Sequence, residues 1–167
     1  LLWPRFVRAF AAMVRPRRLH LETAGAHPAT LASLLGVVDH VSLDLKLPGD
    51  LAAPVDPLPA DEEREGVPGD GAAWRAARRS CLDVLAGRDA CAKLVLCDTS
   101  SEREAYEALD DLADLAPELP LFVQPATPFG RASAPSDVLV RSVWVYAREL
   151  GLDPRVVPQV HRLLGVR

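Results

Sequence analysis

The sequence of 167 residues is poor in aromatic residues and in cysteine, and it contains no long apolar run. Aromatic residues make up only 5% of the chain, so the core has to be built mainly from leucine, valine and alanine. No apolar run approaches the ~20 residues that a membrane-spanning helix needs, and no signal-peptide pattern is present. We therefore expect a cytoplasmic protein that has no membrane partner.

Metal-binding cysteine patterns are also missing. The spacings between Cys81, Cys91 and Cys97 match neither a zinc site nor an iron–sulfur site. We expect reduced thiols, with Cys81 on the apolar face of a helix and the other two on either side of a strand. A net charge of −4 argues against nucleic acid as a partner, because domains that bind it are usually basic.

The chain begins with leucine, and its first residues, Leu-Leu-Trp-Pro, are typical of a segment inside a protein. We therefore expect the 167 residues to be a portion of a longer chain.

What the sequence does contain is a regular alternation of helix-type and strand-type patterns. Helical spacing of apolar residues is found in segments 3–15, 28–35, 71–87, 102–115 and 136–150. Strand-type patterns are found in segments 19–23, 38–46, 93–97, 119–124 and 155–159. In the first helix the apolar residues that share a face are Trp3, Phe6, Phe10, Met13 and Val14. Residues 47–70 break the alternation, because their prolines and acidic residues are typical of an exposed acidic loop or insertion.

This alternation predicts a single α/β domain over residues 1–167, with parallel strands and helices outside them. An open doubly wound sheet and a β/α barrel both satisfy the order. Neither a GxGxxG motif nor a P-loop follows a strand, so the common nucleotide-binding fingerprints do not favour the open sheet. In both folds the functional site gathers at the C-terminal ends of the strands.

The strand over residues 38–46 has the most informative C-terminal end. Its period-two alternation places Ser42, Asp44 and Lys46 on the face opposite its apolar residues. A carboxylate and an ammonium that are buried together need partners. Two interpretations follow: these groups bind a zwitterionic ligand that also carries hydroxyl groups, or they form an internal Asp44–Lys46 ion pair.

The other strand ends offer single polar groups, and each of these has two interpretations. Thr23 and Gly25 could contact a ligand at the end of strand 19–23, or they could only form a turn. Gln124 could present its amide to a ligand or cap a loop. His161 could be a general base or a ligand, or it could be a surface histidine.

Five segments in order resemble the radical S-adenosylmethionine (SAM) enzymes of the 7-carboxy-7-deazaguanine synthase family. Leu21–Gly25 resembles the ETxG segment of that family, and Asp39–Pro48 resembles its D-x-[IV]-S-x-x-x-K-x-P segment, with Asp-Leu where many members have Ser-Pro. Lys93–Leu96 resembles the K-[FV]-V-V strand, and Phe122–Pro125 resembles the LQP strand. Pro158–Arg167 resembles the closing PQxHKxLGxR, with an arginine in place of the lysine.

The resemblance implies the C-terminal part of a partial (β/α)6 radical SAM barrel. The missing N-terminal part would hold the first strand, a GGEP motif and the CxxxCxxC loop that ligates a 4Fe–4S cluster. The whole enzyme would be a lyase that converts 6-carboxytetrahydropterin to 7-carboxy-7-deazaguanine in queuosine biosynthesis, with SAM, the cluster and magnesium as cofactors. The 167 residues alone would be inactive.

The resemblance also implies roles for single residues by their position. Thr23 would contact the pterin substrate. Gly25, Asp44, Lys46 and Gln124 would contact SAM. The resemblance assigns neither a catalytic residue nor a cluster ligand within this chain.

Two other functions stay open. An Asp-x-Lys segment is also common in glycyl-radical-activating enzymes, which share the barrel and SAM but act on a partner protein. Gln124-Pro125 and the closing segment favour the synthase. Alternatively, the chain is a half-barrel that serves as a non-catalytic binding subunit. An open barrel edge would also promote self-association, for example as a homodimer.

Overall fold

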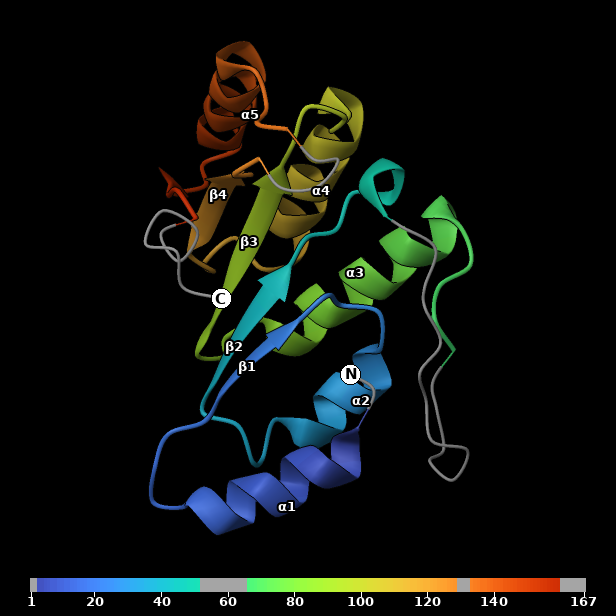
Figure 1. The fold of residues 1–167 in the computed structure, drawn as a ribbon, viewed down its shortest axis with the longest axis vertical. Coiled ribbons are helices and arrows are strands. Elements are labelled where there is room, and N and C mark those ends of the chain that lie inside the picture. Colours follow the sequence, from blue (N-terminus) through green and yellow to red (C-terminus); the bar gives the residue numbers. More distant parts are fainter. Residues whose placement is uncertain (1–2, 52–65, 129–132, 160–167) are drawn as a thin grey trace.

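Five strand-type segments form one parallel sheet in the computed structural model, which describes residues 3–51, 66–128 and 133–159 (Figure 1). The strands are β1 (His20–Thr23), β2 (His40–Asp44), β3 (Ala90–Leu96), β4 (Leu121–Pro125) and β5 (Pro154–Val156). They lie in sequential order, and each one pairs in parallel with the next. The predicted α/β class with parallel strands is therefore confirmed.

The helices follow the predicted segments closely. They are α1 (Pro4–Val14), α2 (Pro28–Leu34), α3 (Gly71–Leu85), α4 (Glu102–Leu115) and α5 (Asp137–Glu149), with a short 3-10 helix, η1 (Pro48–Asp50). Side-chain caps explain where the three longest helices begin. Asp70 caps α3 by accepting a hydrogen bond from Ala73 N at 2.8 Å, and Ser101 and Ser136 cap α4 and α5 in the same way.

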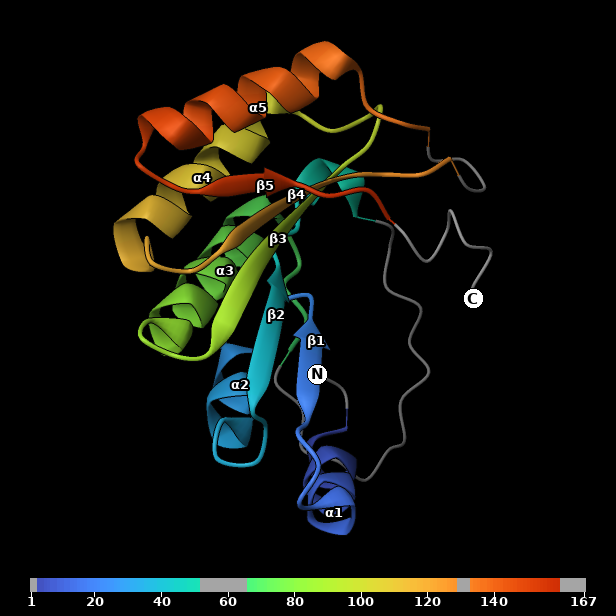
Figure 2. The ribbon, with the colours of Figure 1, turned by 90° about the vertical axis from the view of Figure 1, so that its left-hand side faces the viewer.

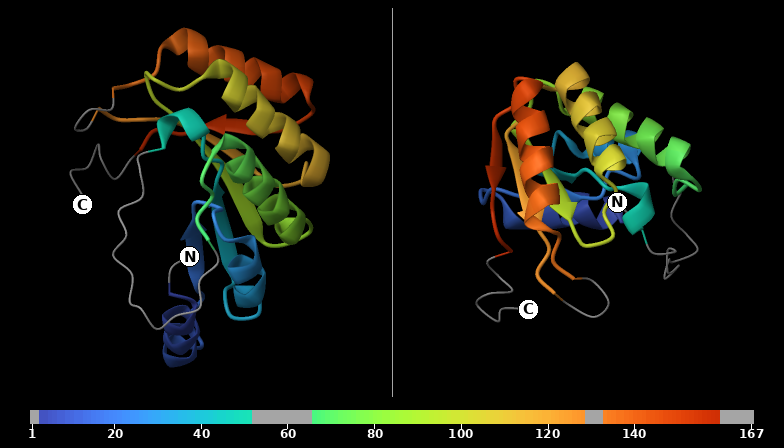
Figure 3. Two further views of the ribbon diagram at one scale, coloured as in Figure 1. Left: turned by 90° about the vertical axis from the view of Figure 1, so that its right-hand side faces the viewer. Right: turned by 90° about the horizontal axis from the view of Figure 1, so that it is seen from above.

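The helices α2, α3, α4 and α5 lie on one face of the sheet, and within the described residues no helix covers the other face (Figures 2 and 3). This arrangement decides between the two predicted folds. A doubly wound sheet reverses its strand order and carries helices on both faces. Sequential strands with helices on one side form part of the wall of a β/α barrel.

Leucine side chains fill the space between the sheet and the helices, as the shortage of aromatic residues predicts. The largest of the fully buried side chains include Leu31, Leu34, Leu43, Leu82, Leu94, Leu109 and Leu121. Every second residue of β2 and β3 points into this core, so the alternate residues point to the uncovered face.

The predicted start of the third strand was wrong. Strand β3 begins at Ala90 rather than at residue 93, so Cys91 lies inside the strand and not before it. Pairing with β2 from Val41 onward extends the strand at this end. The predicted loop over residues 47–70 opens with η1, and its residues 52–65 lie outside the described residues.

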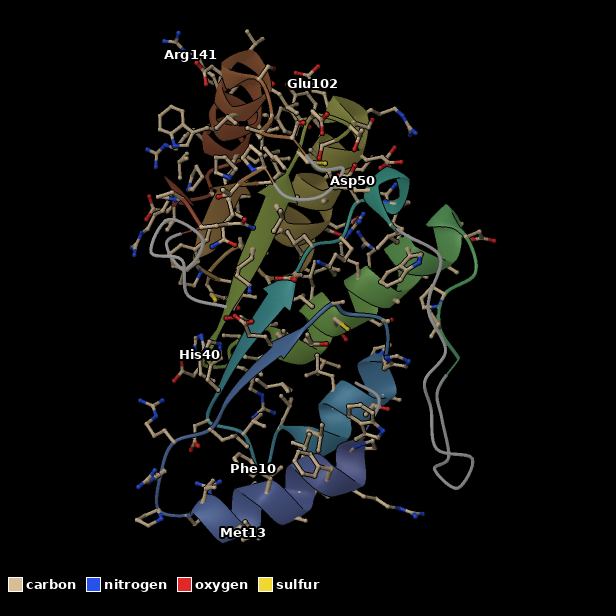
Figure 4. The ribbon with its side chains drawn as sticks, in the orientation of Figure 1. Phe10, Met13, His40, Asp50, Glu102 and Arg141 are labelled. Carbon is tan, nitrogen blue, oxygen red and sulfur yellow. The ribbon has the colours of Figure 1, made fainter. Side chains whose placement is uncertain are left out.

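Helix α1 has an apolar face that the described residues leave exposed. Ala11 is its buried residue, whereas Phe6 is 64% exposed and Met13 is 81% exposed. Phe6 stacks on Phe10 within the helix, with ring centroids 5.9 Å apart, and Figure 4 marks Phe10 and Met13 on α1. The predicted helix is therefore confirmed, but its aromatic stripe does not pack into the core.

Candidate functional site

Polar side chains gather on the uncovered face of the sheet, near the C-terminal ends of β1, β2 and β3. The register pairs Glu22 with Ser42 and Asp44 with Lys93. Because directly paired residues in a parallel sheet point to the same side, these side chains share the face that no helix covers. The sheet thus brings together groups that are 71 residues apart in sequence, as in the Glu22–Lys93 contact.

These side chains form a chain of alternating charges. Lys93 Nζ lies 2.9 Å from Glu22 Oε1 and 3.1 Å from Asp44 Oδ1. Lys46 Nζ lies 3.0 Å from Asp44 Oδ2. The predicted Asp44–Lys46 ion pair is therefore present, and Lys93 joins it from the neighbouring strand. We name Glu22, Lys93, Asp44 and Lys46 the charge chain.

Asp44 Oδ1 is the least satisfied polar atom of the charge chain. It is closed off from solvent and has no hydrogen-bond partner among the described residues, although the Lys93 ammonium is within ion-pair distance. Buried carboxylate oxygens normally accept hydrogen bonds. Because Oδ1 is closed off from solvent, the Lys93 ammonium at 3.1 Å is the group that compensates its charge.

A cavity of about 250 Å³ opens beside the charge chain at the C-terminal ends of the strands. Asp44 and Lys46 line it from β2 and the residues after it, Cys97 lines it after β3, and Ala126 lines it after β4. Asp50 on η1 lines it from a further side (Figure 4). The cavity thus lies where parallel α/β folds place their ligands.

The segment from Lys46 to Asp50 is held at several points, which makes this side of the cavity well defined. Arg78 Nη1 donates to the Lys46 carbonyl at 3.4 Å, and Gly49 N donates to Glu104 at 2.9 Å. The Asp50 carboxylate accepts hydrogen bonds from the hydroxyls of Thr99 and Ser100. Sequence reasoning missed these contacts because they join this segment to residues at least 32 positions away in the sequence.

The predicted turn after β1 is present, and it occupies Thr23 and Gly25. Thr23 is buried and pairs with Leu43, so it lies on the helix-covered face. Its hydroxyl accepts a hydrogen bond from Gly25 N at 3.2 Å. Gly25 has a φ of +73°, and a Cβ built at this position would lie 3.9 Å from the Asp44 carbonyl oxygen. The geometry thus supports the turn interpretation, and the ligand roles of both residues stay predictions.

One of the two remaining predicted residues lies at the same end of the sheet, and the other lies outside the described residues. Gln124 is half-buried on β4 and pairs with Val95, which lines the cavity. His161 lies outside the described residues. Ser42, on the polar face of β2, is already occupied, because its hydroxyl lies 2.7 Å from His20 Nε2 and 3.1 Å from Cys91 Sγ.

The three cysteines lie on separate parts of the molecule and do not form a cluster site. Cys81 is buried on α3 and donates its thiol to the Gly25 carbonyl. Cys91 is buried on β3, and Cys97 lies half-buried beside Thr99. No group of three or more histidine, cysteine or acidic side chains in the described residues is arranged to hold a metal ion. These residues therefore do not fit a 4Fe–4S cluster.

Sequence reasoning missed Lys93 and Glu22 as members of the site. The start of β3 at Ala90 places Cys91, Lys93 and Val95 on the uncovered face by period two. The predicted strand over residues 93–97 carries the same alternation, but only the pairing of Lys93 with Asp44 decides that the two side chains meet. A signal that could have found Lys93 is its rarity, because Lys46 and Lys93 are the only lysines in the chain.

None of the helices in the described parts of the chain is both long enough and apolar enough to cross a membrane.

Comparison with known proteins finds a curated protein of similar sequence and solved structures of similar fold. No protein-family model matches the chain. Among curated proteins, the 7-carboxy-7-deazaguanine synthase of Geobacter sulfurreducens is 24% identical over 147 residues, which cover 88% of this chain and 52% of that protein. The chain thus spans about half the length of this curated relative.

Two solved structures have the same arrangement of strands and helices. A domain of a pyruvate-formate lyase-activating enzyme from Bacteroides vulgatus aligns with a TM-score of 0.67 and 14% identity, over 93% of this chain and 92% of that one. A radical SAM methyltransferase from Sphaerobacter thermophilus aligns with a TM-score of 0.56 and 20% identity, over 85% of this chain and 40% of that one. At these identities the likeness shows the fold, which is that of radical SAM domains and agrees with a partial barrel.

Proposed function

We propose that this chain is the SAM-holding part of a radical SAM enzyme that makes 7-carboxy-7-deazaguanine from 6-carboxytetrahydropterin. The observation that carries the proposal is the Asp44–Lys46 pair beside a cavity at the C-terminal end of β2. The synthase from Geobacter sulfurreducens supports the specific reaction, because its similarity extends over 88% of the chain.

The groups around the cavity suit a zwitterion with a ribose. Lys46 is one-third exposed, so its ammonium can turn from Asp44 to the carboxylate of SAM. The Asp44 carboxylate lines the cavity and would accept a hydrogen bond from a ligand hydroxyl. Gly25 would allow close approach of the ligand to the backbone, and Gln124 would offer its side-chain amide. Bound SAM would supply the adenosyl group for radical chemistry, while the protein orients it.

The cysteines of this chain do not provide a set of ligands for a 4Fe–4S cluster. All three cysteines of the chain lie in the described part and on separate elements, so they offer no common site. We therefore propose that the cluster is held by a part of the protein beyond these 167 residues. The coverage of only 52% of the Geobacter protein supports this division. A role for magnesium stays a prediction, because the described acidic residues form no metal site.

The rival activity is that of a glycyl-radical-activating enzyme. The domain from the Bacteroides vulgatus activating enzyme has the same fold over nearly its whole length. A fold shared at 14% identity does not favour its reaction over that of the synthase. We favour the synthase because both the Gln124-Pro125 segment and the similar curated protein point to it.

The binding step can be tested on the chain itself by isothermal titration calorimetry with SAM. We expect measurable binding to the wild-type chain. Lys46→Met and Asp44→Asn should each weaken it on the order of 10- to 100-fold, since each removes a hydrogen bond to a charged group. Arg103→Met, at an exposed position on α4, is the matched control and should bind SAM as the wild type does. A wild-type chain that does not bind SAM contradicts the proposal.

The reaction can be tested on the longer protein after reconstitution with iron and sulfide. Formation of 7-carboxy-7-deazaguanine from 6-carboxytetrahydropterin is the expected result. A radical on a partner protein, with no deazaguanine product, would instead favour the activating enzyme.

A further inference from the structure

Lysine is used at only two positions in this chain, and both belong to the charge chain. Of 19 basic residues other than histidine, only Lys46 and Lys93 are lysines. The others are arginines, including those that form ion pairs elsewhere in the fold. Lysine differs from arginine in having a compact ammonium that three acceptors can surround, rather than a planar fork. The site around Asp44 therefore uses a group that the rest of the molecule does not use.

Lys93 on β3 lies between two carboxylates, those of Glu22 on β1 and Asp44 on β2. Its ammonium donates to Glu22 Oε1 at 2.9 Å and lies 3.1 Å from Asp44 Oδ1. The side chain is only 16% exposed, so its position is fixed more firmly than that of an exposed lysine. Glu22 is 67% exposed, and it therefore holds Lys93 from the solvent side.

Asp44 has a counter-ion on each of its oxygens when no ligand is bound. Lys46 faces Oδ2, and Lys93 faces Oδ1. A ligand carboxylate that binds Lys46 withdraws one of these counter-ions. A half-buried carboxylate that loses its counter-ion is destabilised, and this would oppose ligand binding. The second lysine removes the difficulty, because Asp44 stays paired while Lys46 turns to the ligand.

We infer that Lys93 is a positioning residue, which holds Asp44 in place and compensates its charge when a ligand carboxylate takes Lys46. The inference rests on the proposed SAM site and names the group that allows Lys46 to exchange partners. Lys93 itself touches Asp44 and Glu22 rather than the ligand.

The protonation of Lys93 agrees with this role. Burial acts to lower the pKa of its ammonium, but the hydrogen bond to Glu22 and the charge of Asp44 outweigh burial and raise the pKa above its ordinary value of 10.5. Lys93 therefore stays charged over the whole range in which a protein of this kind works.

The first test compares SAM with decarboxylated SAM by calorimetry. In Lys93→Met the affinity for SAM should fall about tenfold, because Lys46 then remains bound to an otherwise unpaired Asp44. The affinity for decarboxylated SAM should change much less, since that ligand does not need Lys46. Arg155→Met, which removes a cation from β5 on the same sheet, is the control and should change neither affinity. A Lys93→Met chain with wild-type affinity for SAM overturns the inference.

The second test needs no ligand, so it separates failure of this inference from failure of the proposed SAM site. Urea unfolding of Asp44→Asn, Lys46→Met and the double variant gives the coupling between these two residues. The same cycle is then measured in the Lys93→Met background. The coupling should be larger there, because Asp44 has lost its other counter-ion. If SAM does not bind the wild-type chain, the proposed SAM site is wrong. If the coupling between Asp44 and Lys46 is unchanged by Lys93→Met, Lys93 does not compensate Asp44, whether or not SAM binds.

Discussion

At the scale of single residues, Gly25 is a position where both the backbone conformation and the packing require glycine. Its φ of +73° lies in the left-handed region, which costs other residues roughly 1–2 kcal/mol. A Cβ at this position would also lie 2.9 Å from Leu43 Cδ1, and Leu43 is fully buried. The turn itself therefore requires glycine at this position.

Gly25→Ala should lower the free energy of unfolding by about 3 kcal/mol, from the backbone conformation and the contact with Leu43 together. Gly87→Ala is the matched control, because Gly87 has a φ of +69° but no atom near its Cβ position. It should cost only about 1 kcal/mol. Urea unfolding of the two variants measures the difference. Equal costs at the two positions would show that Leu43 can move aside.

At the scale of elements, α3 and α4 are joined by one buried carboxylate. Asp111 on α4 is inaccessible to solvent and accepts hydrogen bonds from Arg75, Arg78 and Arg79 on α3, with the shortest at 2.6 Å from Arg78 Nη2. Arg78 also donates to the Lys46 carbonyl, so the helix pair supports the proposed site from behind.

Asp111→Asn should destabilise the chain by roughly 3–5 kcal/mol at pH 7, because Arg78, whose side chain is 5% exposed, loses its counter-ion. Burial acts to raise the pKa of Asp111, but hydrogen bonds from Arg79, Arg78 and Arg75 outweigh it and hold the pKa below its ordinary value of 3.8. A lowered folded-state pKa means that this stabilisation is present above about pH 4 and is lost as the pH falls through the folded-state value.

Urea unfolding at pH 7 and at pH 3 would measure both effects, and the difference between wild type and Asp111→Asn should shrink at the lower pH. Asp114→Asn is the control, since Asp114 is 61% exposed and pairs only with Arg79 among the described residues. It should have little effect. A variant at Asp111 that is as stable as the control would mean that the three arginines are paired elsewhere.

At the scale of the whole molecule, the sheet is covered on one face only and has open edges at β1 and β5 within the described residues (Figures 2 and 3). Helix α1 contacts α2 and lies at the N-terminal end of β1 (Figure 1), and Phe6 and Met13 of its apolar face are exposed. Exposed apolar stripes and unpaired strand edges promote association.

The isolated chain should therefore self-associate in a concentration-dependent way, as sedimentation velocity would detect. Replacing Phe6 and Met13 together by glutamine should reduce the association, because the two side chains are 64% and 81% exposed. The same variant should change the free energy of unfolding by less than about 1 kcal/mol. Val138→Gln, at an exposed position on α5, is the control for a general loss of surface hydrophobicity. A wild-type chain that remains monomeric would contradict the prediction.

The order and type of the elements could be predicted from the sequence because they depend on local patterns. The helical spacing of Leu82 and Leu85 and the alternation around Asp44 were sufficient to place α3 and β2. Boundaries were less accurate where pairing extends a strand, as at Ala90. The candidate site was predicted in part: Asp44 and Lys46 share the uncovered face and line the cavity, whereas Lys93 and Glu22 were missed.

Local sequence patterns are enough to predict that strands and helices alternate, that the core is leucine-rich, and that β2 carries charges on one face. Residues close together in sequence decide these features through periodicity and capping. The sequential order of the strands, the covering of one face by helices and the position of Lys93 between Glu22 and Asp44 depend on long-range packing. The register between strands joins residues up to 71 positions apart, and it is fixed by packing and strand pairing rather than by any local pattern.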